Sequence, residues 1–315
     1  ADAVVQFKGP ERPKDVRHPA AFHAFRKDKP EAESLLLEVC QDQDSPAFTR
    51  AGAMLALRRF MSEASFDEAR RNLDANDSVV RVAAISKLED LPDVDSHRDL
   101  IPMLKDPVRS VRTEAARILA RSPETLFSGE DLVLFNEVFA ELKLRYTSNL
   151  DRPESHLSLG ILAENRNQPF VAEKHYQQAV RRESTYVPAR MNLATLLSQR
   201  GRSGEAEKLL IEAAELQPSW GQVHYSLGLL LAEDPNRLPE AIRSLERASA
   251  YWKDNPRVFN NLAIAYWQSD KIEDAINSFL QAIRIQPENP EFLQKSNSLK
   301  RHLQHRIFQK EKSRK

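Results

Sequence analysis

The strongest constraint on the fold is an internal repeat of about 34 residues that occupies residues 153–289. Four copies begin at Pro153, Val187, Gly221 and Pro256, so their starts are separated by 34, 34 and 35 residues. The third copy contains the segment LAEDPNRLPEA, which is one residue longer than its counterparts. We expect a loop to absorb this residue. A period of this length indicates one supersecondary unit repeated along the chain.

Small and large apolar residues recur at fixed offsets within each copy. Ala194, Gly228 and Ala263 are equivalent small residues, and Tyr176 and Phe279 are equivalent large ones. Small residues let two helices approach closely, and large ones fill the space between helix turns. Each copy therefore predicts a pair of packed helices, whose remaining apolar surface the neighbouring copy must cover.

This pattern resembles the tetratricopeptide repeat. The resemblance implies an all-α fold in which helix pairs stack into a right-handed α-α superhelix, or solenoid. In that family the first helix of each pair lines a concave groove, and fixed positions of these helices contact the partner protein. Carried onto this chain, the resemblance gives the partner-binding candidates Leu157, Ile161, Met191, Asn192, Tyr225, Leu229, Asn261, Ile264 and Trp267.

The expected groove is mostly apolar in its middle. A partner peptide or helix would be anchored there by hydrophobic side chains, with Tyr225 and Trp267 as the strongest contacts. The side-chain amides of Asn192 and Asn261 would hold its backbone. In the alternative, residues such as Tyr225 and Leu229 only pack against the neighbouring repeat, or the C-terminal helix folds back into the groove.

Residues 31–127 contain a second period, seen in SPAFTRAGAMLAL, DSVVRVAAISKL and PVRSVRTEAARIL. Arg50, Arg81 and Arg112 are 31 residues apart, and these units resemble short HEAT repeats. We expect each arginine to bind neighbouring carboxylates and backbone carbonyls between stacked repeats. The alternative is a basic stripe for an acidic partner. The same spacing relates two sets of apolar residues: Ala53, Ala84 and Ala115, and Leu57, Leu88 and Leu119.

Three further segments complete the predicted organisation. Residues 1–30 are an N-terminal extension, and residues 128–152 form a connecting helix with Ser128 as its N-cap. Residues 290–315 form a capping helix followed by a basic tail. The apolar stripe of the connecting helix consists of Leu132, Phe135, Val138, Phe139, Leu142 and Tyr146, and that of the capping helix of Phe292, Leu293, Leu299, Leu303 and Phe308.

Composition and motifs argue against several classes of protein. The formal net charge is zero, which gives no basis for a nucleic-acid partner, and no apolar stretch is long enough to cross a membrane. The single cysteine, Cys40, lies in an apolar helical run and is expected to be a buried structural thiol. No recognised catalytic or metal-binding motif is present. We therefore expect no enzymatic activity, no cofactor and no metal.

The order of the segments also resembles the C-terminal accessory region of some bacterial multihaem c-type cytochromes. This resemblance rests on VRHPAAFHAFRKDKPEAESLLLEVC, on the short HEAT-like units and on DRPESHLSLGILAE. The chain lacks CxxCH and so cannot attach haem covalently itself. The resemblance implies docking on a redox-protein partner, with His18 or His23 near that partner's haem.

Two functions follow from the sequence. The first is a non-enzymatic interaction scaffold that binds a protein or peptide in the groove. The second is an accessory domain or subunit of a periplasmic multihaem cytochrome or another enzyme assembly. In either role we expect a soluble protein of the bacterial periplasm or cytoplasm.

Overall fold

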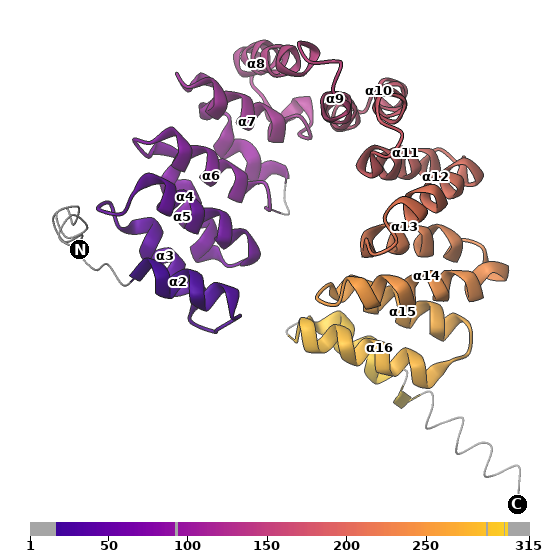
Figure 1. The fold of residues 1–315 in the computed structure, drawn as a ribbon. Coiled ribbons are helices and arrows are strands. Elements are labelled where there is room, and N and C mark those ends of the chain that lie inside the picture. The colour runs from indigo at the N-terminus through magenta and orange to yellow at the C-terminus, as the bar shows by residue number, and fades with distance from the viewer. Residues whose placement is uncertain (1–16, 92–93, 288, 299, 302–315) are drawn as a thin grey trace, which may run out of the picture. The chain divides into compact units, whose positions relative to one another are not determined.

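The fold of the chain is built from helices alone in the described part of the computed structural model (Figure 1). The all-α prediction is therefore confirmed. The chain divides into two compact units, with the boundary between Ser148 and Asn149. The structure describes residues 17–91, 94–287, 289–298 and 300–301.

The first unit consists of short helices, most of which pack against the helices next to them in the chain. Its elements are α2 (Arg17–Arg26), α3 (Ala32–Gln41), α4 (Ala47–Ala56), η1 (Leu57–Arg59), α5 (Glu63–Arg71), η2 (Asn72–Asp74), α6 (Ser78–Leu88), η3 (Val94–Leu100), η4 (Pro102–Lys105), α7 (Arg109–Leu119), η5 (Glu124–Leu126) and α8 (Gly129–Thr147).

The 31-residue period corresponds to the stacked helices α4, α6 and α7, of which α6 packs against both others. The three equivalent alanines and three equivalent leucines named above all have no exposed surface, so these periodic positions belong to the core of the first unit. The first helices of the copies are less regular. In the third copy two 3-10 helices, η3 and η4, take the place of an α-helix.

Each of the three periodic arginines reaches a carboxylate that follows it in the chain, on the next repeat or, for Arg112, on α8. Arg81 donates from Nε and Nη2 to both oxygens of Asp106, at 2.7 and 3.1 Å, and Arg112 donates likewise to Glu141, at 2.8 Å each. Nη2 of Arg50 lies 3.7 Å from Oδ2 of Asp77. Nη1 of Arg81 and of Arg112 also binds backbone carbonyls. The predicted inter-repeat contacts are confirmed, which argues against a basic stripe for a partner.

Helix α2, which lies within the predicted N-terminal extension of residues 1–30, packs against α3 and α4 of the first unit. Ala21 and Ala24 on α2 are buried. Cys40 is also buried, and burial raises the pKa of its thiol to about 12, in agreement with a structural role. Residues 1–16 lie outside the described part of the chain.

Helix α8 begins as predicted. The side chain of Ser128 accepts a hydrogen bond from the backbone N–H of Asp131, which caps the helix. The helix ends at Thr147, before the predicted boundary at residue 152, and packs against α7 of the first unit. Four of its predicted apolar residues are buried: Phe135, Val138, Phe139 and Leu142.

Loss of an inter-repeat arginine should destabilise the first unit. Arg81 and Asp106 are only 12% and 6% exposed in their side chains, and a buried charge without its partner is costly. We expect Arg81→Met to lower the free energy of unfolding by about 3 kcal/mol, measured by chemical denaturation. Arg59→Met is the control, because Arg59 and its partner Asp28 are 55% and 64% exposed. It should cost at most about 1 kcal/mol, and an equal effect of both variants would contradict the assignment.

Residues 153–285 of the second unit form four helix pairs, and the two helices of each pair pack together. Their bounds are α9 (Pro153–Asn165) with α10 (Pro169–Arg182), α11 (Val187–Gln199) with α12 (Ser203–Leu216), α13 (Gly221–Ala232) with α14 (Leu238–Tyr251), and α15 (Pro256–Gln268) with α16 (Ile272–Ile285); η6 (Pro235–Arg237) lies between α13 and α14.

Close approach within the pairs depends on small residues of the first helices. A Cβ atom built on Gly160 would lie 2.3 Å from the ring of Tyr176, and one built on Gly228 would lie 2.6 Å from Leu245. Neither position has room for a side chain. The glycines therefore set how near α10 and α14 come to α9 and α13, as the sequence pattern predicts.

The turns between paired helices use a left-handed residue. Asn167, Gly201 and Asp270 have φ angles of 53°, 74° and 59°, and each lies fourteen residues after the start of its copy. In the third copy this position is Pro235, whose ring fixes a negative φ. The chain forms η6 there instead, and the extra residue of the copy is absorbed in this longer turn, as expected.

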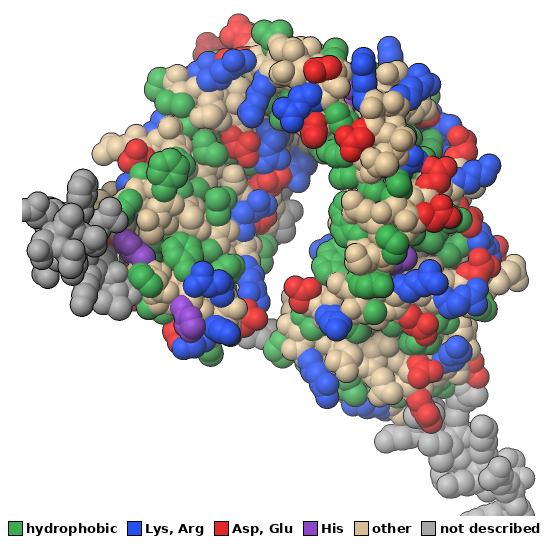
Figure 2. All heavy atoms as spheres, viewed as in Figure 1, with side chains coloured by type: hydrophobic (Ala, Val, Ile, Leu, Met, Phe, Trp, Pro, Cys, Tyr) green, Lys and Arg blue, Asp and Glu red, His purple; other side chains and the backbone are tan. Residues whose placement is uncertain are grey.

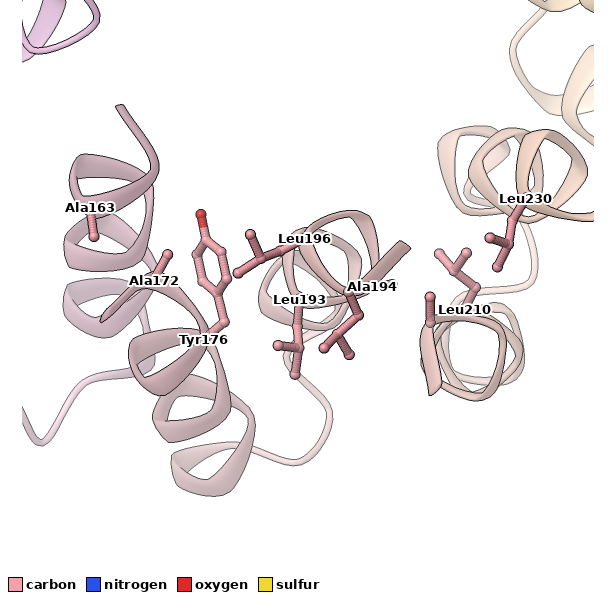
Figure 3. Close-up of a cluster of buried hydrophobic side chains, with 10 residues drawn as sticks. Ala163, Ala172, Tyr176, Leu193, Ala194, Leu196, Leu210 and Leu230 are labelled. Atoms are coloured by element: carbon pink, nitrogen blue, oxygen red, sulfur yellow. The ribbon is translucent and has the colours of Figure 1, made fainter. Parts of the chain in front are cut away.

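The core of the second unit is continuous from one pair to the next. Tyr176 has no exposed surface and points from α10 toward Leu193 and Leu196 of α11 (Figure 3). The same cluster continues through Leu210 on α12 to Leu230 on α13. Neighbouring pairs therefore cover each other's apolar faces, which is what a repeat array requires.

Residues 290–298 are helical and follow the last pair. Phe292 is 5% exposed and covers the end of the array as predicted, whereas Leu293 is 42% exposed and does not. The two residues are adjacent, about 100° apart around the helix, so only one of them faces the core. Leu299, Leu303 and Phe308 lie outside the residues whose side chains are described.

A methyl group at the closest helix contact should be destabilising. We expect Gly160→Ala to lower the free energy of unfolding by about 1–3 kcal/mol, because the new Cβ overlaps the buried ring of Tyr176. Gly204→Ala is the control, since a Cβ on Gly204 in α12 meets no atom within 4 Å. It should stabilise by up to about 1 kcal/mol through helix propensity. Urea unfolding of both variants tests this, and equal midpoints would refute it.

Candidate partner-binding groove

The predicted groove residues lie on α9, α11, α13 and α15, the first helices of the four pairs. Hydrophobic side chains gather along the edge of the second unit that α11 and α13 form (Figure 2). Three predicted residues, one each on α9, α13 and α15, expose a large part of their surface: Ile161 (38%), Leu229 (39%) and Trp267 (49%). These are the residues that a partner can reach without any rearrangement of the fold.

Other predicted residues lie deeper. Met191 is 6% exposed and packs with Val187, Ala213 and Val223 beneath the surface. Leu157 is partly buried against the cluster around Tyr176. These side chains shape the groove from below, and they offer little area to a partner.

The two predicted amides are already used inside the unit. Asn192 hydrogen-bonds the hydroxyl of Tyr176, which donates to the carboxylate of Glu164. Asn261 donates from Nδ2 to the hydroxyl of Tyr225, at 2.7 Å. Burial, together with Glu164, raises the pKa of Tyr176 well above its usual range. Each amide thus binds a tyrosine of the preceding repeat.

Tyr225 belongs partly to the core. Its ring meets Trp252 edge-on, with ring centroids 6.0 Å apart, and packs beside Ile242 and Leu245. Ile264 is likewise partly buried, against the cluster of the last pair. Most contacts of these two residues are therefore with the neighbouring repeat or their own helix pair, as in the alternative in which groove residues serve only for packing. The hydroxyl of Tyr225 and the faces of both side chains already have partners.

The link between first helices recurs one repeat later. Asn260, like Tyr225, is the fifth residue of its copy, and its Oδ1 accepts a hydrogen bond from Nζ of Lys295, at 3.3 Å. Lys295 lies 34 residues after Asn261, the equivalent donor in the fourth copy. The helix at 290–298 therefore continues the series of first helices, and no described residue shows it folded back along the groove.

A hollow of about 210 Å³ lies between α11 and α13, with Leu210 of α12 in its lining. Leu229 is the one predicted partner-binding residue that lines it. Its other lining residues are Ala194, Thr195, Ser198, Gln199, Ser226, Leu230 and Glu233.

The sequence analysis missed Gln199 and Glu233 of this hollow. Gln199 lies four residues after Thr195, and Glu233 lies four residues after Leu229, and residues at i and i+4 share a helix face. Helix periodicity alone was sufficient to find them. They give the apolar hollow a polar rim with one negative charge.

Two histidines of the first pair are in direct contact. Nδ1 of His156 lies 3.2 Å from Nδ1 of His175, so one ring must donate and the other accept. Burial lowers the pKa of His156, with a further effect of Arg182. Burial also lowers the pKa of His175, to which His156 and Lys174 add. Burial therefore favours the neutral form of both rings.

The structure also places the histidines expected near a partner's haem. His18 contacts the side chain of Ser45, and its Nε2 lies 3.9 Å from a carboxylate oxygen of Asp42, whereas His23 is exposed. Among the described residues, no three histidine, cysteine or acidic side chains are grouped to hold a metal. None of the helices described here has the length and apolar character needed to cross a membrane.

Family models of the tetratricopeptide repeat match residues 189–217 and 230–290. The chain therefore contains tetratricopeptide repeats, as the offsets of small and large residues predict. A curated relative, the general transcriptional corepressor ssn6 of Schizosaccharomyces pombe, is 26% identical over 59% of this chain. The match covers only 17% of that relative's length.

Solved structures with a similar arrangement include MamA from Desulfovibrio magneticus, at 18% identity, a TM-score of 0.44, and coverage of 48% of this chain and 85% of that chain. YrrB, described as a TPR protein with an unusual peptide-binding site, has 19% identity and a TM-score of 0.41, with coverage of 59% and 90%. The HEAT-like and cytochrome resemblances stay predictions from the sequence.

The histidine pair predicts a loss of stability in acid. Because the folded pKa values are lowered, the unfolded chain binds more protons once the pH falls below about 6.5, and unfolding is favoured. We expect His175→Gln to reduce the decline in unfolding free energy between about pH 7 and pH 5, by about 1 kcal/mol. Denaturation midpoints across this range measure it, with His23→Gln as the exposed control. A decline of unchanged steepness in His175→Gln would contradict the assignment.

Proposed function

We propose that the chain is a non-enzymatic scaffold that binds a segment of a partner protein in the groove of its tetratricopeptide repeats. The observation that carries this proposal is the exposure of Ile161, Leu229 and Trp267 on the first helices of three repeats. Large apolar side chains that stay exposed on successive units of an array favour association with another protein.

The size of the hollow beside Leu229 favours a side chain as its occupant. Its volume of about 210 Å³ is below the range of about 300–1,000 Å³ that drug-sized ligands fill. One hydrophobic residue of a partner fits this space. The surrounding Thr195, Ser226 and Glu233 then supply hydrogen bonds to the partner backbone, a role that the sequence analysis assigned to the asparagines.

Trp267 offers a second anchor on the fourth repeat. It is the most exposed of the predicted groove residues, and tryptophan is enriched among residues that dominate binding energy. Since Leu229 and Trp267 lie on adjacent first helices, one continuous partner segment can contact both. Tyr225 contributes mainly by holding α13 against α15 through its bond to Asn261.

A non-catalytic role is supported by how ionised side chains are used. Glu89 binds Arg117, and Glu207 binds Arg237, each through two hydrogen bonds. Such pairs connect neighbouring repeats, since their members are 28 and 30 residues apart. Their charges are thus used to join neighbouring repeats, in the same way as those of Arg81 and Asp106.

Removal of the two exposed anchors should weaken partner binding without loss of the fold. Peptides are selected by display against the wild-type protein, and their affinities are then measured by calorimetry for Leu229→Ser/Trp267→Ala. We expect about a tenfold or greater loss of affinity that persists at high salt, because the contacts are apolar.

The matched control is Phe170→Ala, since Phe170 on α10 is 74% exposed and lies outside the predicted groove. It should bind the selected peptides as the wild type does. Circular dichroism confirms that all variants keep their helices. Selected peptides that bind the double variant and the wild type equally would exclude the groove as the binding site.

A further inference from the structure

A second cleft of the second unit lies between α12 and α14, the second helices of two adjacent repeats, and α13 forms its floor. Its volume is about 550 Å³, within the range that drug-sized ligands occupy. We call it the second-helix cleft. It is lined by Ile211, Ala214, Glu215, Pro218, His224, Leu227, Arg247 and Tyr251.

The second-helix cleft is separate from the groove. Leu227 lines the cleft and Leu229 lines the groove hollow, and both are on α13. Two residues along an α-helix differ by about 200° around its axis, so these side chains point to nearly opposite sides. A ligand in one site leaves the other accessible.

Apolar surface is left uncovered on both walls of this cleft. Ile211 on α12 is 42% exposed, and Tyr251 on α14 is 54% exposed. Between them, Leu227 is only partly buried. Exposed aliphatic and aromatic surface around a concave space of this size is the usual setting of a binding site.

Tyr251, the aromatic residue on the α14 side of the cleft, is held in position by a stacked neighbour. The ring of Tyr251 stacks on His224, with centroids 6.1 Å apart and an angle of 22° between the planes. His224 is 3% exposed, and its Nε2 lies 2.8 Å from the carbonyl oxygen of Pro218, so this nitrogen carries the proton. A wall that is already ordered loses little conformational entropy on binding.

Opposite charges stand on the two walls. Arg247 projects from α14 and Glu215 from α12, and no ion pair within the described residues joins them. The guanidinium attracts a carboxylate, and Glu215 repels one from the other wall. Together they orient an anionic group toward α14.

We propose that the second-helix cleft is a second docking site, which takes a large apolar side chain next to a carboxylate on a partner protein. The ring or aliphatic group enters between Ile211 and Tyr251, and the carboxylate binds Arg247. This site does not depend on the groove, so the protein can hold two segments at once.

The test uses N-acetyl-L-tryptophan as a probe, because it joins one large apolar ring to one carboxylate. The neutral N-acetyl-L-tryptophanamide is the matched control ligand. Methyl groups of isoleucine and leucine are labelled for NMR, so Ile211 and Leu227 report the cleft while Leu229 and Ile264 report the groove. The whole chain is used.

We expect the probe to shift the Ile211 and Leu227 signals, with about threefold weaker binding of the amide. Tyr251→Ser should abolish these shifts, and Arg247→Gln should remove the difference between the two ligands. Both residues are exposed, so neither substitution disturbs the core. Shifts confined to Leu229 and Ile264, equal binding of both ligands by the wild type, or no shift at all would overturn the proposal.

Discussion

The second unit depends on the contact of a large side chain with a glycine or alanine on the neighbouring helix. Tyr176 against Gly160, and Leu245 against Gly228, leave no room for even one methyl group. Because the small residue must face inward, the residue after it is turned by about 100° toward the other side. Those residues are Ile161 and Leu229. The exposure of apolar side chains in the groove is therefore a consequence of how the helices pack.

The same array presents two surfaces of different chemistry. The groove side offers aliphatic groups and one tryptophan beside small hydroxyl and amide groups. The second-helix side offers a fixed tyrosine between an arginine and a glutamate. First helices supply the groove, and second helices supply most of the cleft, so substitutions on one side can alter binding there with little change on the other. A repeat fold can in this way separate two recognition tasks over a short length of chain.

Periodicity predicted the fold well, because the spacing of small and large residues reports directly on helix packing. It located all four helix pairs, the longer third turn, the Ser128 cap and the contacts of Arg81 and Arg112. Periodicity was less successful in predicting which groove residues are exposed. Met191 and Asn192 occupy groove positions, yet one is buried and the other binds Tyr176. The position of a residue along a helix determines the direction in which its side chain points. How deeply that side chain is buried depends on the size of the residues packed around it.

The three periodic arginines of the first unit, Arg50, Arg81 and Arg112, each precede their carboxylate in the chain. Arg81 precedes its carboxylate by 25 residues, and Arg112 precedes its carboxylate by 29. During synthesis each of these arginines therefore leaves the ribosome well before the carboxylate that neutralises it. Each of these ion pairs can therefore form only after the following helix segment has been made. Helix α8, which carries Glu141, completes this series of ion pairs.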